Sequence, residues 1–182
     1  MFCNLPVTHN TREVSDMLTI KPVDPSRTDI YQIIEQLDEY QSSLYPPESN
    51  HLDSIEELSK SNAFFLAAFI DSAICGIGSV KLIENYGEIK RVYVPENHRG
   101  KGIAIALMEE LENYLIKQAM AYARLETGIH QTEAIGLYER LGYHRIDPFG
   151  DYKQDPLSIF MGKNFCELPL FSSGAIERNL QS

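Results

Sequence analysis

The sequence predicts a single α/β domain with a mixed central sheet of about seven strands and about four helices. At 182 residues the chain suits one domain, since domains average about 150 residues. A composition of 43% hydrophobic and 23% charged residues is typical of a globular protein with a buried core. The spacing of apolar residues also changes along the chain between helical and extended patterns, without an internal repeat.

The first part of the chain predicts one strand and two helices. Residues 18–23 form an extended stretch that ends at an Asp-Pro turn, as strands often do. Residues 29–44 carry apolar side chains at helical spacing. Pro46 and Pro47 end that helix, because proline removes a backbone donor and restricts the residue before it. A shorter helix is expected over residues 52–60.

The middle of the chain predicts three strands in an antiparallel meander. Residues 63–70, 73–83 and 86–94 are extended, apolar stretches joined by short polar turns. The remaining elements alternate in type. They are a long amphipathic helix at 102–120, a strand at 122–126, a helix at 132–141 and strands at 143–146 and 157–161.

These elements place the folded domain at residues 18–163. Residues 1–17 are expected to be a flexible N-terminal tail, and residues 164–182 a C-terminal tail, because neither segment shows periodicity. The C-terminal tail and the last strand, which is expected to be exposed, are available for a homodimer.

Composition also excludes several classes of function. With 16 Lys and Arg against 26 Asp and Glu, the net charge of −10 argues against a broad nucleic-acid-binding face. No apolar run approaches the ~20 residues of a membrane helix, and the start of the chain lacks the pattern of a secretory signal. Three scattered cysteines fit a reducing cytoplasm. The five histidines show no ligand spacing, so no metal site is expected.

A glycine-rich turn between a strand and a helix is the most informative stretch. Gly100 and Gly102 permit close backbone approach just before the long helix, whose first N–H groups lack partners and favour an anion. The local charge agrees, since residues 90–101 hold four basic residues and one acid. A solvated turn that only leads into the helix is the alternative. No Walker loop or dinucleotide fingerprint occurs.

Two motifs, in this order, resemble the GNAT superfamily of N-acetyltransferases. The first is Arg99-x-x-Gly102-x-Ala104, after a strand end and before a long helix. The second is Ala134-x-x-Leu137-Tyr138-x-x-x-Gly142-Tyr143. The resemblance covers about residues 17–163 and implies an enzyme that uses acetyl-CoA as cosubstrate.

The resemblance also implies a set of cofactor-binding residues. The backbone of the turn would hold the pyrophosphate, and main-chain groups at the end of the preceding strand would hold the pantetheine and the acetyl carbonyl, where two strands diverge. At position 131 many members carry Asn, whereas this chain has Gln. The residues are Val92, Tyr93, Val94, Arg99, Gly100, Lys101, Gly102, Ile103, Ala104 and Gln131.

Acetyl transfer to an amine needs a neutral amine, a stabilised oxyanion and a way to discharge a thiolate. The second motif makes Tyr138 the candidate for discharging the thiolate, and simple core packing is the alternative. Protonating a thiolate of pKa ~8.5 from a phenol of pKa ~10 is uphill by about 2 kcal/mol in water. Tyr138 is therefore expected mainly to donate a hydrogen bond.

The candidate base is Glu88, on the strand that leads to the acetyl site and similar in position to the catalytic glutamate of histone-acetylating relatives. Direct proton removal from an alkylammonium by an ordinary glutamate is uphill by about 8 kcal/mol, so a water relay is easier. Glu88 could instead form an exposed ion pair with Lys90 on the same face of the strand. Glu84 or solvent are the substitutes.

The expected acceptor is the amine of a small molecule, either amino-acid-like or cationic, which attacks directly in a ternary complex. Residues 45–51 and 155–158 are candidates to face it, although a plain surface loop is equally compatible with the first segment. Two alternatives remain open: a CoA-binding regulatory module without turnover, and an N-acetyltransferase of proteins or peptides.

Overall fold

The computed structural model describes residues 17–165, and the predicted tails lie almost wholly outside the described residues. The strands are β1 (Leu18–Pro22), β2 (Ala63–Ile70), β3 (Ala73–Ile83), β4 (Tyr86–Tyr93), β5 (Tyr122–Gly128), β6 (His144–Arg145) and β7 (Ser158–Asn164). The helices are α1 (Thr28–Leu44), α2 (Ile55–Leu58), α3 (Ile103–Lys117) and α4 (Thr132–Arg140), with 3-10 turns η1 (Pro47–Ser49) and η2 (Glu96–His98). The predicted α/β domain is confirmed.

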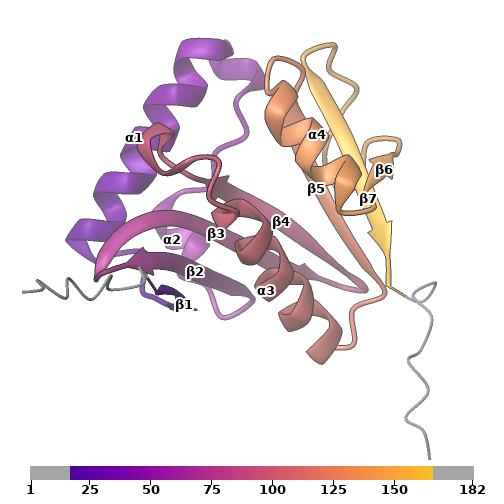
Figure 1. Cartoon of the computed structure of the whole chain (residues 1–182). Helices are drawn as coiled ribbons and strands as arrows, with labels where there is room; N and C mark the ends of the chain where they lie inside the picture. The colour runs from indigo at the N-terminus through magenta and orange to yellow at the C-terminus, as the bar shows by residue number, and fades with distance from the viewer. Residues whose placement is uncertain (1–16, 166–182) are drawn as a thin grey trace, which may run out of the picture.

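The strands form one sheet in the order β1-β2-β3-β4-β5-β7-β6 (Figure 1). The pairing of β4 with β5 is parallel and the other pairings are antiparallel. The predicted meander is β2-β3-β4. Its first turn has positive φ at both Asp71 and Ser72, as a tight two-residue hairpin requires.

The last strand differs from the expectation in two ways. It runs on to Asn164, and it is not an edge strand over its whole length, because β6 pairs with it through His144 and Arg145. The homodimer stays a prediction, and the rest of the C-terminal tail lies outside the described residues.

The two faces of the sheet are covered by different helices. In β2, Leu66 and Ala68 face the core under α3 and α4, whereas Phe65, Ala67 and Phe69 face the core under α1 and α2. This alternation follows from the opposite directions of successive side chains in a strand. Both cores are needed, since the sheet is apolar on both sides.

β4 and β5 separate at their C-terminal ends. They pair from Tyr86 and Tyr122 as far as Ile89 and Leu125, and beyond that point they diverge (Figure 1). Just past this point β4 is irregular: its register with β3 shifts, and Arg91 has φ of 59°. The divergence opens a gap in the middle of the sheet, which positions the site described below.

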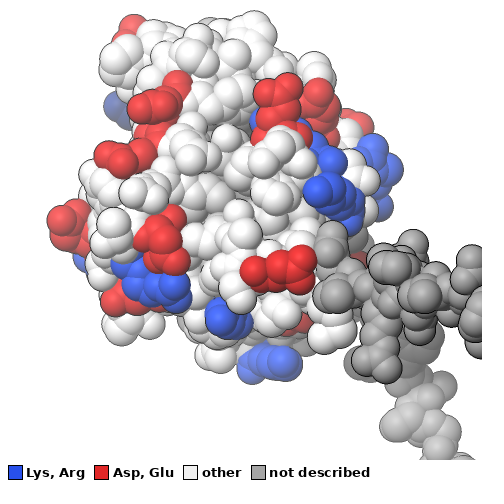
Figure 2. Space-filling view, turned by 60° about the vertical axis from the view of Figure 1, so that its left-hand side comes forward, with Lys and Arg blue, Asp and Glu red and all other residues white. Residues whose placement is uncertain are grey.

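Charged side chains of both signs surround a largely uncharged centre on the face shown in Figure 2. That face carries no broad basic patch. None of the helices in residues 17–165 is long and apolar enough to cross a membrane.

Candidate active site

The glycine turn adopts the backbone that its sequence predicts. Gly100 and Gly102 have φ of 77° and 78°, a region that favours glycine. α3 starts at Ile103, directly after Gly102, with no capping side chain and no acid in its first turn. The helix N-terminus therefore presents N–H groups and a positive dipole end to an incoming anion.

A cavity of about 450 Å³, here called the turn cavity, lies against this turn. Tyr138 and His98 both belong to its lining. The Nδ1 of His98 is buried and has no hydrogen-bond partner among the described residues. Lys101 is the one predicted cofactor residue that does not belong to the lining. The other nine all line it: Val92, Tyr93, Val94, Arg99, Gly100, Gly102, Ile103, Ala104 and Gln131.

A second, larger cavity of about 970 Å³, here called the sheet cavity, lies over the other face of β4. Residues 46–53 and 150–157 both line it, so the two segments singled out in the sequence do lie on one cavity. The rings of His51 and Tyr152 meet edge to face at 5.1 Å and join them.

A small pocket of about 60 Å³, here called the junction pocket, sits where β4 and β5 diverge. Gln131 lines both this pocket and the turn cavity, and Glu88 lines both this pocket and the sheet cavity. The junction pocket therefore borders both larger cavities and shares at least one lining residue with each.

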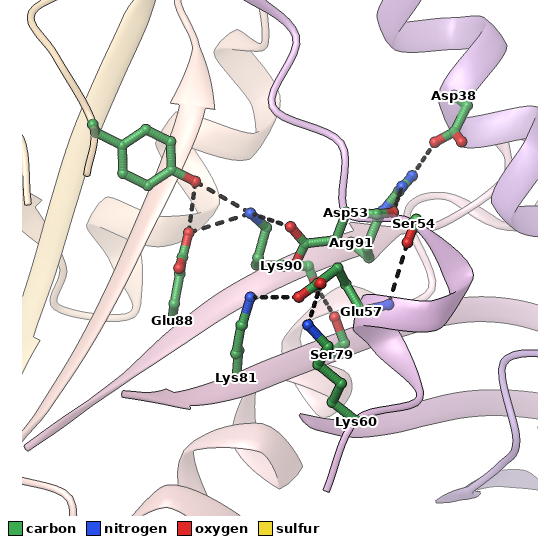
Figure 3. Close-up of polar contacts among 11 residues, drawn as sticks. Asp38, Asp53, Ser54, Glu57, Lys60, Ser79, Lys81, Glu88, Lys90 and Arg91 are labelled. Atoms are coloured by element: carbon green, nitrogen blue, oxygen red, sulfur yellow. Dashed lines mark hydrogen bonds and ion pairs between the residues drawn. The ribbon is translucent and has the colours of Figure 1, made fainter. Parts of the chain in front are cut away.

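Glu88 is buried, with 6% of its surface exposed, inside a polar cluster (Figure 3). The Tyr152 hydroxyl donates a hydrogen bond of 2.6 Å to Glu88 Oε1. Lys90 Nζ lies 3.4 Å from the same oxygen and 3.1 Å from Asp53 Oδ1. The expected ion pair thus exists, but it is buried rather than exposed, because the segments around Asp53 and Tyr152 cover the sheet here. Sequence reasoning missed Tyr152, which is distant along the chain.

Glu84, the substitute base, lies in the turn between β3 and β4 with φ of 45°. It lines none of the three cavities.

Glu126, which sequence reasoning also missed, lines the junction pocket from β5. Its carboxylate accepts a hydrogen bond of 2.6 Å from the Ser158 hydroxyl. Burial raises the pKa of Glu126, and this effect exceeds the opposing effects of the Ser158 hydrogen bond and of nearby positive charges. The only sequence signal was a carboxylate near the end of a strand.

A profile of the Acetyltransferase (GNAT) family matches residues 29–143. The chain belongs to this family. It is similar to the IAA acetyltransferase of Azospirillum brasilense, with 38% identity over 148 residues, which cover 80% of this chain and 97% of that protein.

Solved structures agree with this assignment. A Klebsiella pneumoniae protein assigned as an acyl-CoA N-acyltransferase has a TM-score of 0.69 and 34% identity, covering 82% of this chain and 98% of that one. The fold is also that of the PaiA N-acetyltransferase of Thermoplasma acidophilum in complex with coenzyme A, with a TM-score of 0.62 and 20% identity, over 82% of this chain and 99% of that one.

This GNAT protein is therefore an N-acetyltransferase, with acetyl-CoA as its cosubstrate. The turn cavity fits such a carrier, because the glycine turn and the uncapped N-terminus of α3 line it, together with His98, whose buried Nδ1 has no hydrogen-bond partner in the described part of the chain. In residues 17–165, no group of three or more His, Cys, Asp or Glu side chains is placed to hold a metal ion.

Two hydrogen bonds fix the orientation of the side-chain amide of Gln131. Its carbonyl oxygen accepts hydrogen bonds from the Thr127 hydroxyl at 2.8 Å and from the Gly128 N–H at 3.2 Å. With the oxygen occupied, the NH₂ group is the part left to donate. Gln131 thus offers a donor, and not an acceptor, at the border of the turn cavity and the junction pocket.

Tyr138 is both a core residue and part of a cavity lining, so its position is compatible with core packing and with a role at the thiolate. It is part of the core under α3 and α4, with 7% of its surface exposed and its ring 6.0 Å from that of Tyr143. It also lines the turn cavity. Burial raises the pKa of Tyr138, and the negative charge of Glu126 raises it further.

Proposed function

We propose that this GNAT enzyme transfers the acetyl group of acetyl-CoA to the amine of a small cationic molecule, by direct attack with both substrates bound. The observation that carries the proposal is the meeting of the turn cavity and the sheet cavity at the junction pocket, where β4 and β5 diverge. A volume of about 970 Å³ lies within the range of sites for small molecules, which favours such an acceptor over a folded protein.

The charge of the sheet cavity supports a cationic acceptor. Its lining holds five carboxylates and three lysines. Two of the lysines are already paired, Lys81 with Glu57 and Lys90 with Asp53 and Glu88. An ammonium group entering this cavity therefore meets an excess of negative charge, which attracts it over a distance of about 10 Å.

Acetyl-CoA supplies an activated acetyl thioester to this arrangement. The amides at the start of α3 suit the diphosphate, and the main chain of residues 92–94 together with the Gln131 amide suits the pantetheine. The acetyl thioester end of the carrier would then enter the junction pocket from the side of Gln131.

The role proposed for Tyr138 is to donate a hydrogen bond to the leaving sulfur. Because burial raises the pKa of Tyr138, its hydroxyl stays protonated at neutral pH. Complete proton transfer to a thiolate was already uphill by about 2 kcal/mol for an ordinary phenol. The raised pKa of Tyr138 makes this proton transfer more unfavourable still. Tyr138 therefore contributes mainly a hydrogen bond to the sulfur and not a transferred proton.

We assign the role of base to Glu126. The family resemblance had instead favoured Glu88. Glu88 already accepts a hydrogen bond from Tyr152 and lies beside Lys90, so its carboxylate is engaged by two side chains of the polar cluster. Glu126 has a raised pKa and so holds a proton more readily, directly or through a water. Glu88 then serves to orient Tyr152 and Lys90 on the wall of the sheet cavity.

The test is a thiol-release assay with acetyl-CoA over a panel of diamines, monoamines, amino acids and short peptides. Release is expected with small amines, and fastest with those that carry a second positive charge. Tight binding of acetyl-CoA without release from any amine would contradict the proposed reaction and favour a regulatory module. Release with peptides alone would contradict the small-molecule acceptor.

A further inference from the structure

Tyr45, at the C-terminal end of α1, closes one side of the junction pocket and has no role in the reaction described above. It is buried, with 7% of its surface exposed. Its hydroxyl accepts a hydrogen bond of 3.0 Å from the His130 N–H, and its ring stacks on the His130 imidazole at 5.7 Å. These contacts hold the phenol ring in one place.

β5 is shaped to receive this ring. A Cβ at Gly128 would lie 2.0 Å from Cζ of Tyr45, closer than any real contact. The ring thus occupies the volume that a side chain at position 128 would need. Beyond Ile89 and Leu125, where β4 and β5 no longer pair, Tyr45 supplies the wall that the separated strands do not.

The ring of Tyr45 faces the position where the acyl end of the carrier would lie. Gln131 borders both the turn cavity and the junction pocket, so a thioester that enters along the turn cavity arrives beside Gln131 and faces Tyr45 across a pocket of about 60 Å³. In a pocket of this size, a rigid ring that bounds the far side discriminates by shape between ligands that differ by single methylene groups.

We propose that Tyr45 determines acyl-chain length: its ring bounds the acyl subsite and restricts the enzyme to acetyl-CoA over longer acyl-CoA thioesters. This inference rests on the proposed carrier site in the turn cavity. It concerns the size of the bound acyl group, and it does not require the acceptor to be known.

The test measures binding by calorimetry, without acceptor, for free CoA, acetyl-CoA and butyryl-CoA. Wild-type enzyme is expected to bind butyryl-CoA about tenfold or more weakly than acetyl-CoA, because the fixed ring leaves no room for the two additional methylene groups. Tyr45→Ala is expected to bring the two affinities within about twofold of each other while affinity for free CoA stays the same, because the wall touches only the acyl end. Tyr45→Phe retains the ring and should retain the discrimination.

The control is Tyr31→Ala, the same substitution on the exposed side of α1, where the side chain is 44% exposed. It should leave all three affinities unchanged. If Tyr45→Ala does not fold, Tyr45→Leu empties the far end of the ring's volume and carries the same expectation. Unchanged discrimination in a folded Tyr45→Ala or Tyr45→Leu variant that binds CoA overturns the role of Tyr45. Failure of wild-type enzyme to bind CoA would instead contradict the carrier site itself.

Discussion

Glu126 and Tyr138 hold their protons more tightly than exposed side chains of the same type, and burial is the main cause for both. Burial disfavours the charged form of each group. For Tyr138 this preserves a hydrogen-bond donor at neutral pH. For Glu126 it brings a carboxylate closer to the pH at which a base works best. One physical effect thus suits both groups to the roles proposed for them.

The first prediction concerns the Tyr138 hydroxyl. Tyr138→Phe is expected to lower kcat by about 10²-fold, because the leaving sulfur loses its donor. The ring keeps its contact with Tyr143, so the fold and the affinity for acetyl-CoA should change little. Steady-state thiol release and calorimetry measure the two effects. An unchanged kcat with a good acceptor would leave Tyr138 as a core residue only.

The second prediction concerns the pH dependence of the rate. A base must be ionised, so kcat/KM is expected to rise with pH through the raised pKa of Glu126. Glu126→Gln should remove this rise and lower kcat by about 10²-fold. Glu88→Gln is the matched variant on the neighbouring strand and should keep the rise. If Glu88→Gln removes it instead, the base is Glu88.

The same carboxyl group predicts a change in stability. The folded state favours protonated Glu126, because its folded pKa is raised above the unfolded value. The resulting stabilisation is complete below the ordinary glutamate pKa and is lost as pH rises through the raised one. Glu126→Gln does not titrate, so it should gain stability relative to wild type as pH rises. Denaturant unfolding at several pH values measures this gain, and a gain that grew as pH fell would contradict it.

At the scale of elements, two glycines differ in how closely other side chains pack against them. A Cβ at Gly87 of β4 would lie 2.1 Å from Cδ2 of Leu115, which is fully buried in α3. A Cβ at Gly136 of α4 would approach no atom closer than Arg140 NH1 at 3.7 Å. Close packing therefore requires glycine at position 87 but not at position 136.

This difference gives a fourth prediction, with a matched pair of substitutions. Gly87→Ala is expected to destabilise the fold by about 1–3 kcal/mol, because Leu115 cannot move aside in a packed core. Gly136→Ala should stabilise it by about 0.5–1 kcal/mol, because alanine loses less backbone entropy in a helix. Chemical denaturation measures both. Equal effects of the two substitutions would contradict the packing described here.

At the scale of the whole molecule, the excess of acidic residues and the acidic lining of the sheet cavity act in the same direction. Both attract a cationic acceptor, and salt screens both. We expect kcat/KM for a diamine to fall by about threefold or more between low and high salt, because the Debye length shortens from about 30 Å to about 3 Å. A neutral hydroxyl-substituted amine of equal length should respond less, and equal responses would contradict electrostatic attraction.

The sequence by itself determined the fold class, the order of the elements and the conformation of the turn proposed to bind the carrier. Apolar periodicity is local, and so are the two glycines with positive φ and the start of α3. The two GNAT motifs carried the family and placed Tyr138, because each lies within a single strand–helix unit.

Only the tertiary structure decided how the site is assembled across the sheet. Glu126 and Ser158 are neighbours because β5 pairs with β7, and Tyr152 reaches Glu88 because a later loop folds back over β4. Tyr45 meets Gly128 because α1 ends above the gap between two diverging strands. Contacts between residues tens of positions apart depend on strand order and divergence, and no local pattern in the chain encodes them.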